Sequence, residues 1–214
     1  MNIIKYQSNK YDFRTIVCDW FGVTDLSKLH EIEQYEHFER ETDQSTNWHK
    51  SFYEKIRSDK TFDFIYKKFL EDMIKPRYNE EIVYQKIPTF RVHLPGNVSV
   101  GEFHKDKHYR NVEWAEKVKE TNYYLPLTKA YGTNTIWAES KEDLGDYKPF
   151  KTEYGECIEW NASNLSHGNK DNLTTKTRVS FDFRVIPKSR YMDSDHLTIN
   201  TKIKFGIGGY YEVI

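Results

Sequence analysis

The stretch Val100-Gly101-Glu102-Phe103-His104-Lys105-Asp106 closes a predicted strand and ends in an imidazole and a carboxylate two residues apart. Side chains at that spacing on extended backbone point the same way, so His104 and Asp106 can bind one metal ion. Two ligands hold a catalytic metal poorly, and His167 is the best candidate for a third. Two histidines and one carboxylate on one face of a metal form the facial triad of non-haem Fe(II) oxygenases.

Arg178 and Ser180 form a second candidate binding pair shortly after His167. On a strand the two side chains share a face. A guanidinium is a planar fork suited to a carboxylate, and the neighbouring hydroxyl adds a donor. A metal site beside such a clamp suits a dicarboxylate that chelates the metal at one end and is anchored at the other.

The strand predicted over residues 177–186 indicates how the fold is layered. Its polar and apolar residues alternate, so one face lines a polar interior and the other requires cover from water. The helices predicted before residue 80 are the available cover. The polar set is Arg178, Ser180, Asp182 and Arg184, and the apolar set is Val179, Phe181, Phe183 and Val185.

Short strands separated by Gly, Asn and Pro turns predict a mainly β fold with α-helices, an antiparallel jelly roll or double-stranded β-helix. The N-terminal helices are expected on the outer face of one sheet. The chain is interpreted as a single domain, with a mainly helical cover (1–80), a jelly-roll core (81–190) and a C-terminal extension (191–214). The strands are predicted at 82–87, 89–94, 98–103, 121–127, 134–138, 155–160 and 177–186.

Two helices are predicted in the first third of the chain. The stronger one covers about residues 59–75, carries one apolar stripe that we interpret as core packing, and stops at Pro76. The other has Ser27 as a plausible N-cap; its apolar positions are Leu26, Leu29, Ile32 and Phe38. The stripe of the stronger helix consists of Phe62, Ile65, Tyr66, Phe69, Leu70 and Met73.

Composition and length favour a cytoplasmic protein, and a short chain with modest loops between strands suits a small-molecule substrate better than a folded protein. The chain has 214 residues, a formal net charge of −1 and a pI of about 6.7, which give no argument for a nucleic acid or membrane partner. No apolar run approaches the ~18–20 residues of a membrane span. The two cysteines, Cys18 and Cys157, match neither a disulfide framework nor a zinc motif.

The set His104/Asp106, His167 and Arg178/Ser180 resembles the 2-oxoglutarate/Fe(II)-dependent oxygenases. Longer stretches between about residues 85 and 190 are similar to a bacterial subgroup related to StrG-type proteins of streptomycin biosynthesis. These stretches are 90–96, 102–106, 121–122, 125–130, 132–134, 139–140, 165–169 and 177–184.

The resemblance implies a role for each matching residue. His104, Asp106 and His167 would bind Fe(II), and Arg178 with Ser180 would hold the distal carboxylate of 2-oxoglutarate. Asn122 could hydrogen-bond the chelating end of this cosubstrate. The candidates for substrate contact are Arg91, Trp137, Glu139 and Arg184.

The reaction implied by the resemblance is hydroxylation of a small molecule by O2, with 2-oxoglutarate converted to succinate and CO2. The substrate would be a sugar, an amino acid or a natural-product intermediate. Halogenases of this family lack the metal carboxylate, so the presence of Asp106 favours hydroxylation over halogenation.

Other interpretations stay open at the level of single residues. His104 and Asp106 fit an exposed polar turn, and His167 fits a loop histidine bonded to backbone. Arg178 fits a structural ion pair with Asp182 or another acidic residue. The histidines that could compete as metal ligands are His93, His108 and His196.

Two other classes of function also remain. One is a cupin-like metal-dependent isomerase or epimerase of sugars, which normally shows His-x-His and needs no Arg/Ser clamp. The other is a non-catalytic jelly-roll binding module, which has no reason to keep three metal ligands together. Binding and turnover of 2-oxoglutarate would separate the three classes.

Overall fold

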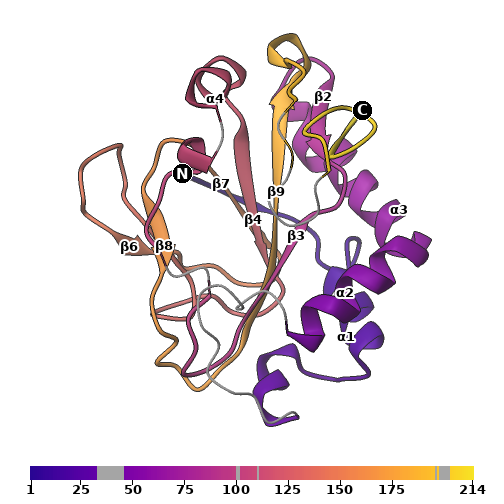
Figure 1. The fold of residues 1–214 in the computed structure, drawn as a ribbon. Helices are drawn as coiled ribbons and strands as arrows, with labels where there is room; N and C mark the ends of the chain where they lie inside the picture. Colours follow the sequence, from indigo (N-terminus) through magenta and orange to yellow (C-terminus); the bar gives the residue numbers. More distant parts are fainter. Residues whose placement is uncertain (33–45, 100–101, 110, 196, 198–202) are drawn as a thin grey trace.

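The computed structural model describes residues 1–32, 46–99, 102–109, 111–195, 197 and 203–214. Its described part contains a seven-stranded sheet, a three-stranded sheet and a group of helices (Figure 1). All pairings between the named strands are antiparallel. The fold is therefore mainly antiparallel sheet with some helices, as the sequence predicts at this coarse level.

The large sheet is centred on β9, which pairs with β4, β2 and β3. Its strands, in spatial order, are β1 (Asn2–Lys5), β7 (Glu156–Trp160), β4 (Thr121–Pro126), β9 (Arg178–Pro187), β2 (Ile82–Gln85) and β10 (Tyr211–Val213), with β3 (Thr89–His93) also on β9. The small sheet has the order β6 (Lys148–Pro149), β5 (Ile136–Ala138) and β8 (His167–Asn169).

Three helices lie together on one side of the large sheet, and the small sheet lies on the other side (Figure 1). The helices are α1 (Phe13–Phe21), α2 (Asn47–Ser58) and α3 (Lys60–Phe69). A fourth, α4 (Val112–Val118), begins after Asn111, whose side chain accepts a hydrogen bond from the Trp114 amide.

The core between these helices and the sheet is largely aromatic. Phe181 of β9 lies 5.1 Å from Phe13 and 5.8 Å from Phe62, measured between ring centroids. Phe183, two residues on, lies 5.5 Å from Tyr66. All five rings are fully buried or nearly so. The predicted layering of β9 is thus confirmed, because its apolar residues meet the helices.

The helix predicted near residues 59–75 is present but changes pitch. It continues from α3 as a π-helix (Leu70–Ile74) and a 3-10 turn (Lys75–Arg77), and Pro76 lies in that turn. The proline lacks an N–H and clashes with the preceding turn, so the regular helix cannot continue. The predicted stripe faces the core, since its members are buried or packed against the core cluster.

The helix predicted around Leu26 is shorter than expected. It is a 3-10 helix (Leu26–Glu31), and Asp25 rather than Ser27 caps it by accepting from the Ser27 amide. A carboxylate at the N-terminus is favoured by the exposed N–H groups. Ile32 is exposed, and Phe38 lies outside the described residues.

The structure differs from the predicted strands at two places. The described residues of 98–103 form no strand, and β1 was not anticipated in the N-terminal part, which is otherwise helical. β1 lies on the edge of the large sheet, with Ile4 opposite Cys157 of β7. A four-residue strand of this kind depends on a distant partner, so its local sequence carries little signal.

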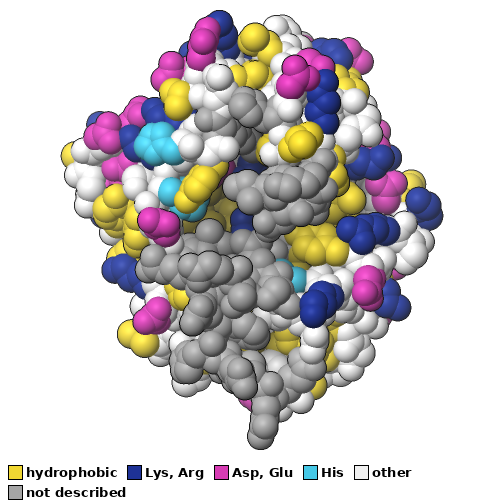
Figure 2. All heavy atoms as spheres, viewed as in Figure 1, with side chains coloured by type: hydrophobic (Ala, Val, Ile, Leu, Met, Phe, Trp, Pro, Cys, Tyr) yellow, Lys and Arg dark blue, Asp and Glu magenta, His cyan; other side chains and the backbone are white. Residues whose placement is uncertain are grey.

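Acidic and basic side chains are interspersed over the face shown in Figure 2, with scattered hydrophobic side chains between them. None of the helices in the described part of the chain is long and apolar enough to cross a lipid bilayer.

Candidate metal centre

The two histidines of the predicted triad are held opposite each other by reciprocal backbone hydrogen bonds. The His104 amide donates to the His167 carbonyl at 2.8 Å, and the His167 amide donates back at 2.9 Å. His167 begins β8, so this isolated bridge extends the small sheet by one residue pair. Their ring centroids are 4.4 Å apart.

Gly168 makes this arrangement possible by leaving room for Phe103. A Cβ at position 168 would lie 3.0 Å from two ring atoms of Phe103 and 3.1 Å from its Cα. Such contacts are too close for any larger residue without movement of the segment that carries His104. The glycine beside His167 therefore fixes how closely the two histidine segments approach.

Each histidine uses Nδ1 to bind the carbonyl oxygen two residues earlier. His104 Nδ1 lies 2.7 Å from the Glu102 carbonyl oxygen, and His167 Nδ1 lies 2.9 Å from that of Leu165. A carbonyl only accepts, so Nδ1 must carry the proton and the lone pair falls on Nε2. The backbone thereby sets both imidazoles in the tautomer that a metal ligand requires.

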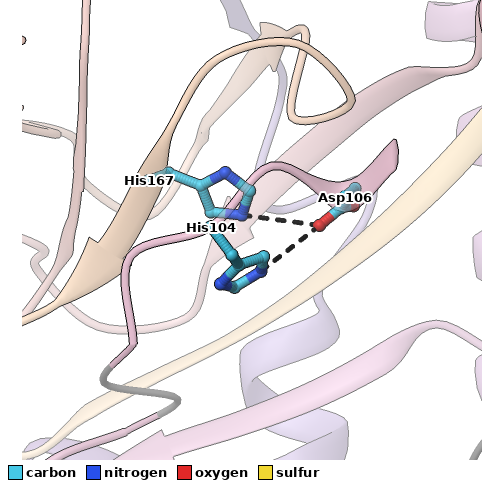
Figure 3. A group of neighbouring side chains, drawn as sticks. All are labelled: His104, Asp106 and His167. Carbon is cyan, nitrogen blue, oxygen red and sulfur yellow. Dashed lines mark ion pairs between the residues drawn. The ribbon is translucent and has the colours of Figure 1, made fainter. Parts of the chain in front are cut away.

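Asp106 completes the group by facing both lone pairs (Figure 3). Its Oδ1 lies 3.5 Å from Nε2 of His104 and 3.5 Å from Nε2 of His167. Asp106 opens a 3-10 helix (Asp106–Tyr109), and its amide donates to the Ala162 carbonyl at 3.0 Å.

The second carboxylate oxygen of Asp106 is held by protein. Oδ2 accepts from Arg184 Nη2 at 3.0 Å and from Asn122 Nδ2 at 3.3 Å. Oδ2 is thus held by Arg184 and Asn122, while Oδ1 faces the two histidines. This division fits a carboxylate that binds a metal through one oxygen.

The three candidate ligands are close enough together to bind one metal ion. The ligand atoms of His104, Asp106 and His167 all lie within 4.8 Å of one another. Burial lowers the pKa of His167, and the Asp106 carboxylate only partly offsets this. His167 is therefore neutral at physiological pH, as metal binding requires.

Arg184 lies among acidic groups. Besides Asp106 it faces Glu120, with Nε 3.6 Å from Oε2, and Asp182, with Nη1 3.9 Å from Oδ2. It also donates to the Tyr210 hydroxyl at 3.1 Å. Burial disfavours its charge, but Tyr210, Asp106 and Glu120 hold the pKa of Arg184 well above its ordinary value. Arg184 therefore stays charged and anchors Asp106.

Arg178 and Ser180 are neighbours, as predicted, and both are buried. Arg178 Nη1 donates to Ser180 Oγ at 3.0 Å, Nε donates to the Asn134 carbonyl at 3.0 Å, and Nη2 donates to Asn169 Oδ1 at 3.3 Å. All three guanidinium nitrogens therefore have protein acceptors. A carboxylate clamp would need to displace some of these bonds.

The candidates for substrate contact divide into two groups. Arg91 and Arg184 line a cavity of about 60 Å³ that is also lined by the candidate metal ligands, and Arg91 Nε donates to Asp182 at 3.2 Å. Trp137 and Glu139 do not line it. The Trp137 indole donates to the Gly132 carbonyl.

Glu139 has a structural role near His167. Its two carboxylate oxygens accept from the amides of Ser166 at 2.6 Å and Gly145 at 3.1 Å. Burial raises the pKa of Glu139, but these backbone hydrogen bonds more than offset that effect and lower it. The charged carboxylate thus fixes the turn that precedes His167.

The competing histidines do not join the cluster. His93 is fully buried, and its Nε2 lies 2.7 Å from the Asn97 carbonyl oxygen. His108 is exposed on the 3-10 helix after Asp106, and His196 lies outside the described residues.

The sequence did not single out Trp160, which lines the cavity and packs edge-on against the His167 ring at 4.7 Å. It ends β7, where it lies opposite Asn122 of β4. Knowing that β4 pairs with β7 would have placed Trp160 next to Asn122 at the site. That pairing cannot be predicted from the sequence of either strand alone.

The fold and this site define an antiparallel β protein with a candidate mononuclear metal centre, and no family model matches the chain. The chain is 33% identical over 211 residues to the streptomycin biosynthesis protein StrG of Streptomyces griseus. The alignment covers 99% of this chain and 97% of StrG. The chain therefore belongs to the StrG family.

Some solved structures share a general likeness at low identity. A non-heme monooxygenase, ThoJ, in complex with nickel matches with a TM-score of 0.47 at 10% identity, over 86% of this chain and 71% of ThoJ. AviO1 from Streptomyces viridochromogenes Tue57 matches with a TM-score of 0.45 at 12% identity, over 88% of this chain and 89% of AviO1.

The comparisons contradict the prediction of an iron- and 2-oxoglutarate-dependent dioxygenase that acts as a hydroxylase. StrG, the relative that defines the family, is described as a streptomycin biosynthesis protein and not as a 2-oxoglutarate-dependent dioxygenase. The structure gives a physical reason in the protein acceptors of Arg178. The cavity of about 60 Å³ is also far below the roughly 300 Å³ at which ligand pockets begin.

Proposed function

We propose that this protein is a mononuclear metal-dependent oxygenase that acts on a small molecule in natural-product biosynthesis. The geometry of His104, Asp106 and His167 carries the proposal. Their ligand atoms all lie within 4.8 Å of one another, and a set of two imidazoles and one carboxylate leaves metal positions open, which is typical of non-haem oxygenases. Membership of the StrG family supports the biosynthetic context.

The chain's own residues would hold and orient the metal. The backbone carbonyls of Glu102 and Leu165 keep both imidazoles in the ligand tautomer, while Arg184 and Asn122 direct one oxygen of Asp106 towards them. A divalent transition metal bound there would supply the O2 chemistry that no amino acid side chain provides.

We also infer that the two sheets are the two walls of a jelly roll with the site between them. The cavity supports this inference because both sheets line it. Ile136 and His167 come from the small sheet, and Asn122 and Arg178 come from the large one.

Metal binding tests the first half of the proposal. Apo protein would be dialysed anaerobically against Fe(II), Co(II), Ni(II) or Zn(II), and bound metal counted by elemental analysis. We expect one ion per chain, lost in His167→Ala and in Asp106→Ala. His108→Ala is the matched control, because His108 is exposed next to the site and should keep the metal. Full metal content in both ligand variants would overturn the assignment.

Oxygen uptake tests the second half. Protein loaded with a redox-active metal should slowly consume O2 with ascorbate as electron donor, and Asp106→Ala should not exceed the rate of free metal. A sugar isomerase would bind metal but would consume no O2. Metal binding without uptake would therefore remove the oxygenase proposal and leave the metal centre.

A further inference from the structure

Besides Nε of Arg184, which faces Glu120 Oε2 at 3.6 Å, two polar atoms beside the candidate metal ligands have no hydrogen-bond partner among the described residues. They are Oδ1 of Asn122 and Nε1 of Trp160, and both side chains line the metal cavity. Asn122 is 3% exposed and Trp160 is 6% exposed. Buried polar groups are almost always paired, so an unpaired acceptor and an unpaired donor in one cavity indicate a ligand that pairs with both.

The two atoms belong to neighbouring positions of the sheet. Asn122 of β4 and Trp160 of β7 are directly opposite in register, so their side chains share a face. Asn122 contacts Asp106, and Trp160 contacts the ring of His167. The pair therefore flanks two of the three metal ligands.

The orientation of the Asn122 amide follows from its partner. Its Nδ2 lies 3.3 Å from Asp106 Oδ2, and an ionised carboxylate can only accept a hydrogen bond. The nitrogen must therefore face Asp106, which leaves the oxygen as an acceptor for the cavity. The indole N–H of Trp160 is a donor only.

We propose that Asn122 and Trp160 form a subsite for a hydroxyl group of the substrate, an inference that rests on the proposed function. A hydroxyl donates one hydrogen bond and accepts others, so a single group can donate to Asn122 Oδ1 and accept from Trp160 Nε1. No carboxylate can do this, because an ionised carboxylate has no hydrogen to give to Asn122.

The space around the pair indicates the rest of the substrate. The metal cavity of about 60 Å³ has room for little more than one functional group, whereas Trp160 also lines a groove of about 930 Å³. The groove volume lies within the usual range of ligand pockets. The body of the substrate would lie in the groove while one hydroxyl reaches the metal centre past Trp160.

The groove is rich in groups that bind hydroxyls. The loop after Trp160 contributes amide and hydroxyl side chains, and α4 with its C-terminal flank contributes charged ones; examples are Asn161, Ser163, Asn164, Glu116 and Lys119. Mixed donors and acceptors of both signs suit a molecule with many hydroxyls better than an apolar or singly charged one. The substrate class is therefore a polyhydroxylated small molecule, such as a sugar or a cyclitol.

The test uses Trp160→Phe, which removes the unpaired N–H and retains a ring. Binding of myo-inositol and of glucose to the metal-loaded full-length protein would be measured by saturation-transfer NMR, and thermal unfolding would be measured on the same samples. We expect myo-inositol and glucose both to bind wild-type protein. The probe that binds wild type more tightly should bind Trp160→Phe about 3- to 10-fold more weakly. The variant should still unfold cooperatively, so that weaker probe binding does not come from loss of the fold.

Trp114→Phe is the matched control. The Trp114 indole donates to the Met192 carbonyl at 3.0 Å, so its loss should lower the unfolding temperature and leave probe binding unchanged. Equal probe affinities in wild type and Trp160→Phe, or no binding to metal-loaded wild type, would overturn the subsite. Metal content measured in parallel keeps this outcome distinct from failure of the proposed function, which would appear as protein that binds no metal.

Discussion

The two faces of β9 are built from alternating residues of one strand, yet they meet different surroundings. On one face Phe181 and Phe183 contact the aromatic rings of the helices and are fully buried. On the other face Arg178 and Arg184 are held by hydrogen bonds and ion pairs around the metal cavity.

The two faces of β9 contribute differently to the stability of the fold. The apolar face gains stability from burial, which depends on area and packing. The polar face gains little net stability, because each buried charge must be compensated by partners in defined positions. Changes on the first face should therefore alter folding, and changes on the second should alter the site with a smaller effect on folding.

The largest expected effect is that of Phe181→Ala. Loss of a fully buried ring that contacts Phe13 and Phe62 should lower the free energy of unfolding by about 3–5 kcal/mol. Urea denaturation would measure this change. Metal stoichiometry at a temperature where the variant is folded should equal that of wild type.

The control is Phe64→Ala, because Phe64 lies on α3 but is 67% exposed. Its effect should stay within about 0.5 kcal/mol. If Phe181→Ala instead removed the metal from folded protein, the apolar face of β9 would affect the site as well as folding, and the proposed difference between the two faces would be wrong.

Acid should destabilise the protein through one buried histidine on each side of the sheet. Burial, followed by the charges of nearby arginines, lowers the pKa of His49 on α2 to about 3, and burial and Arg178 lower that of His93 on β3 to about 3. The unfolded state binds these protons near pH 6.5 and the folded state does not. Stability is therefore complete above that pH and falls as the pH decreases towards 3.

Each histidine should contribute about 1 kcal/mol per pH unit below pH 6. Urea denaturation of apo protein at pH 7, 6 and 5 would measure the slope, and His93→Gln should reduce it by the contribution of one group. His108→Ala, which alters an exposed histidine, should leave the slope unchanged. A slope that is the same in wild type and His93→Gln would show that His93 takes up its proton in the folded state.

The smallest effect is expected for Ser180→Ala on the polar face. Arg178 Nη1 would lose an acceptor at 3.0 Å, which should cost about 1–2 kcal/mol of unfolding free energy. Ser189→Ala removes an exposed hydrogen bond to Glu80 and should cost less than about 0.5 kcal/mol. If the two variants were equally stable, the interaction of Ser180 with Arg178 would not contribute to folding.

Much of the fold follows from local patterns in the sequence. The alternation in β9 predicts both of its faces, and the stripe from Phe62 to Met73 predicts the helix that covers one of them. The N-terminal strand β1 and the C-terminal strand β10 were not predicted, because short edge strands are stabilised by distant partners.

The sequence identified the three candidate ligands, but it did not identify the side chains that contact them. The spacing of His104 and Asp106 and the choice of His167 correspond to three side chains that the structure brings together. Spacing could not show that Arg184 would bind Asp106 or that Arg178 would donate to Asn134, since such contacts depend on strand register and loop path. The prediction that Arg178 holds a cosubstrate did not anticipate these protein acceptors.

The reciprocal hydrogen bonds between His104 and His167 have a consequence for the order in which the protein forms. They close a long loop between two segments far apart in the chain, a contact that is entropically costly and tends to form late in folding. The three candidate ligands therefore come together only after the chain has closed on itself. A metal ion bound to His104 and His167 would link the two ends of that loop. Because it would bind only the folded chain, it would raise the free energy of unfolding of the whole protein.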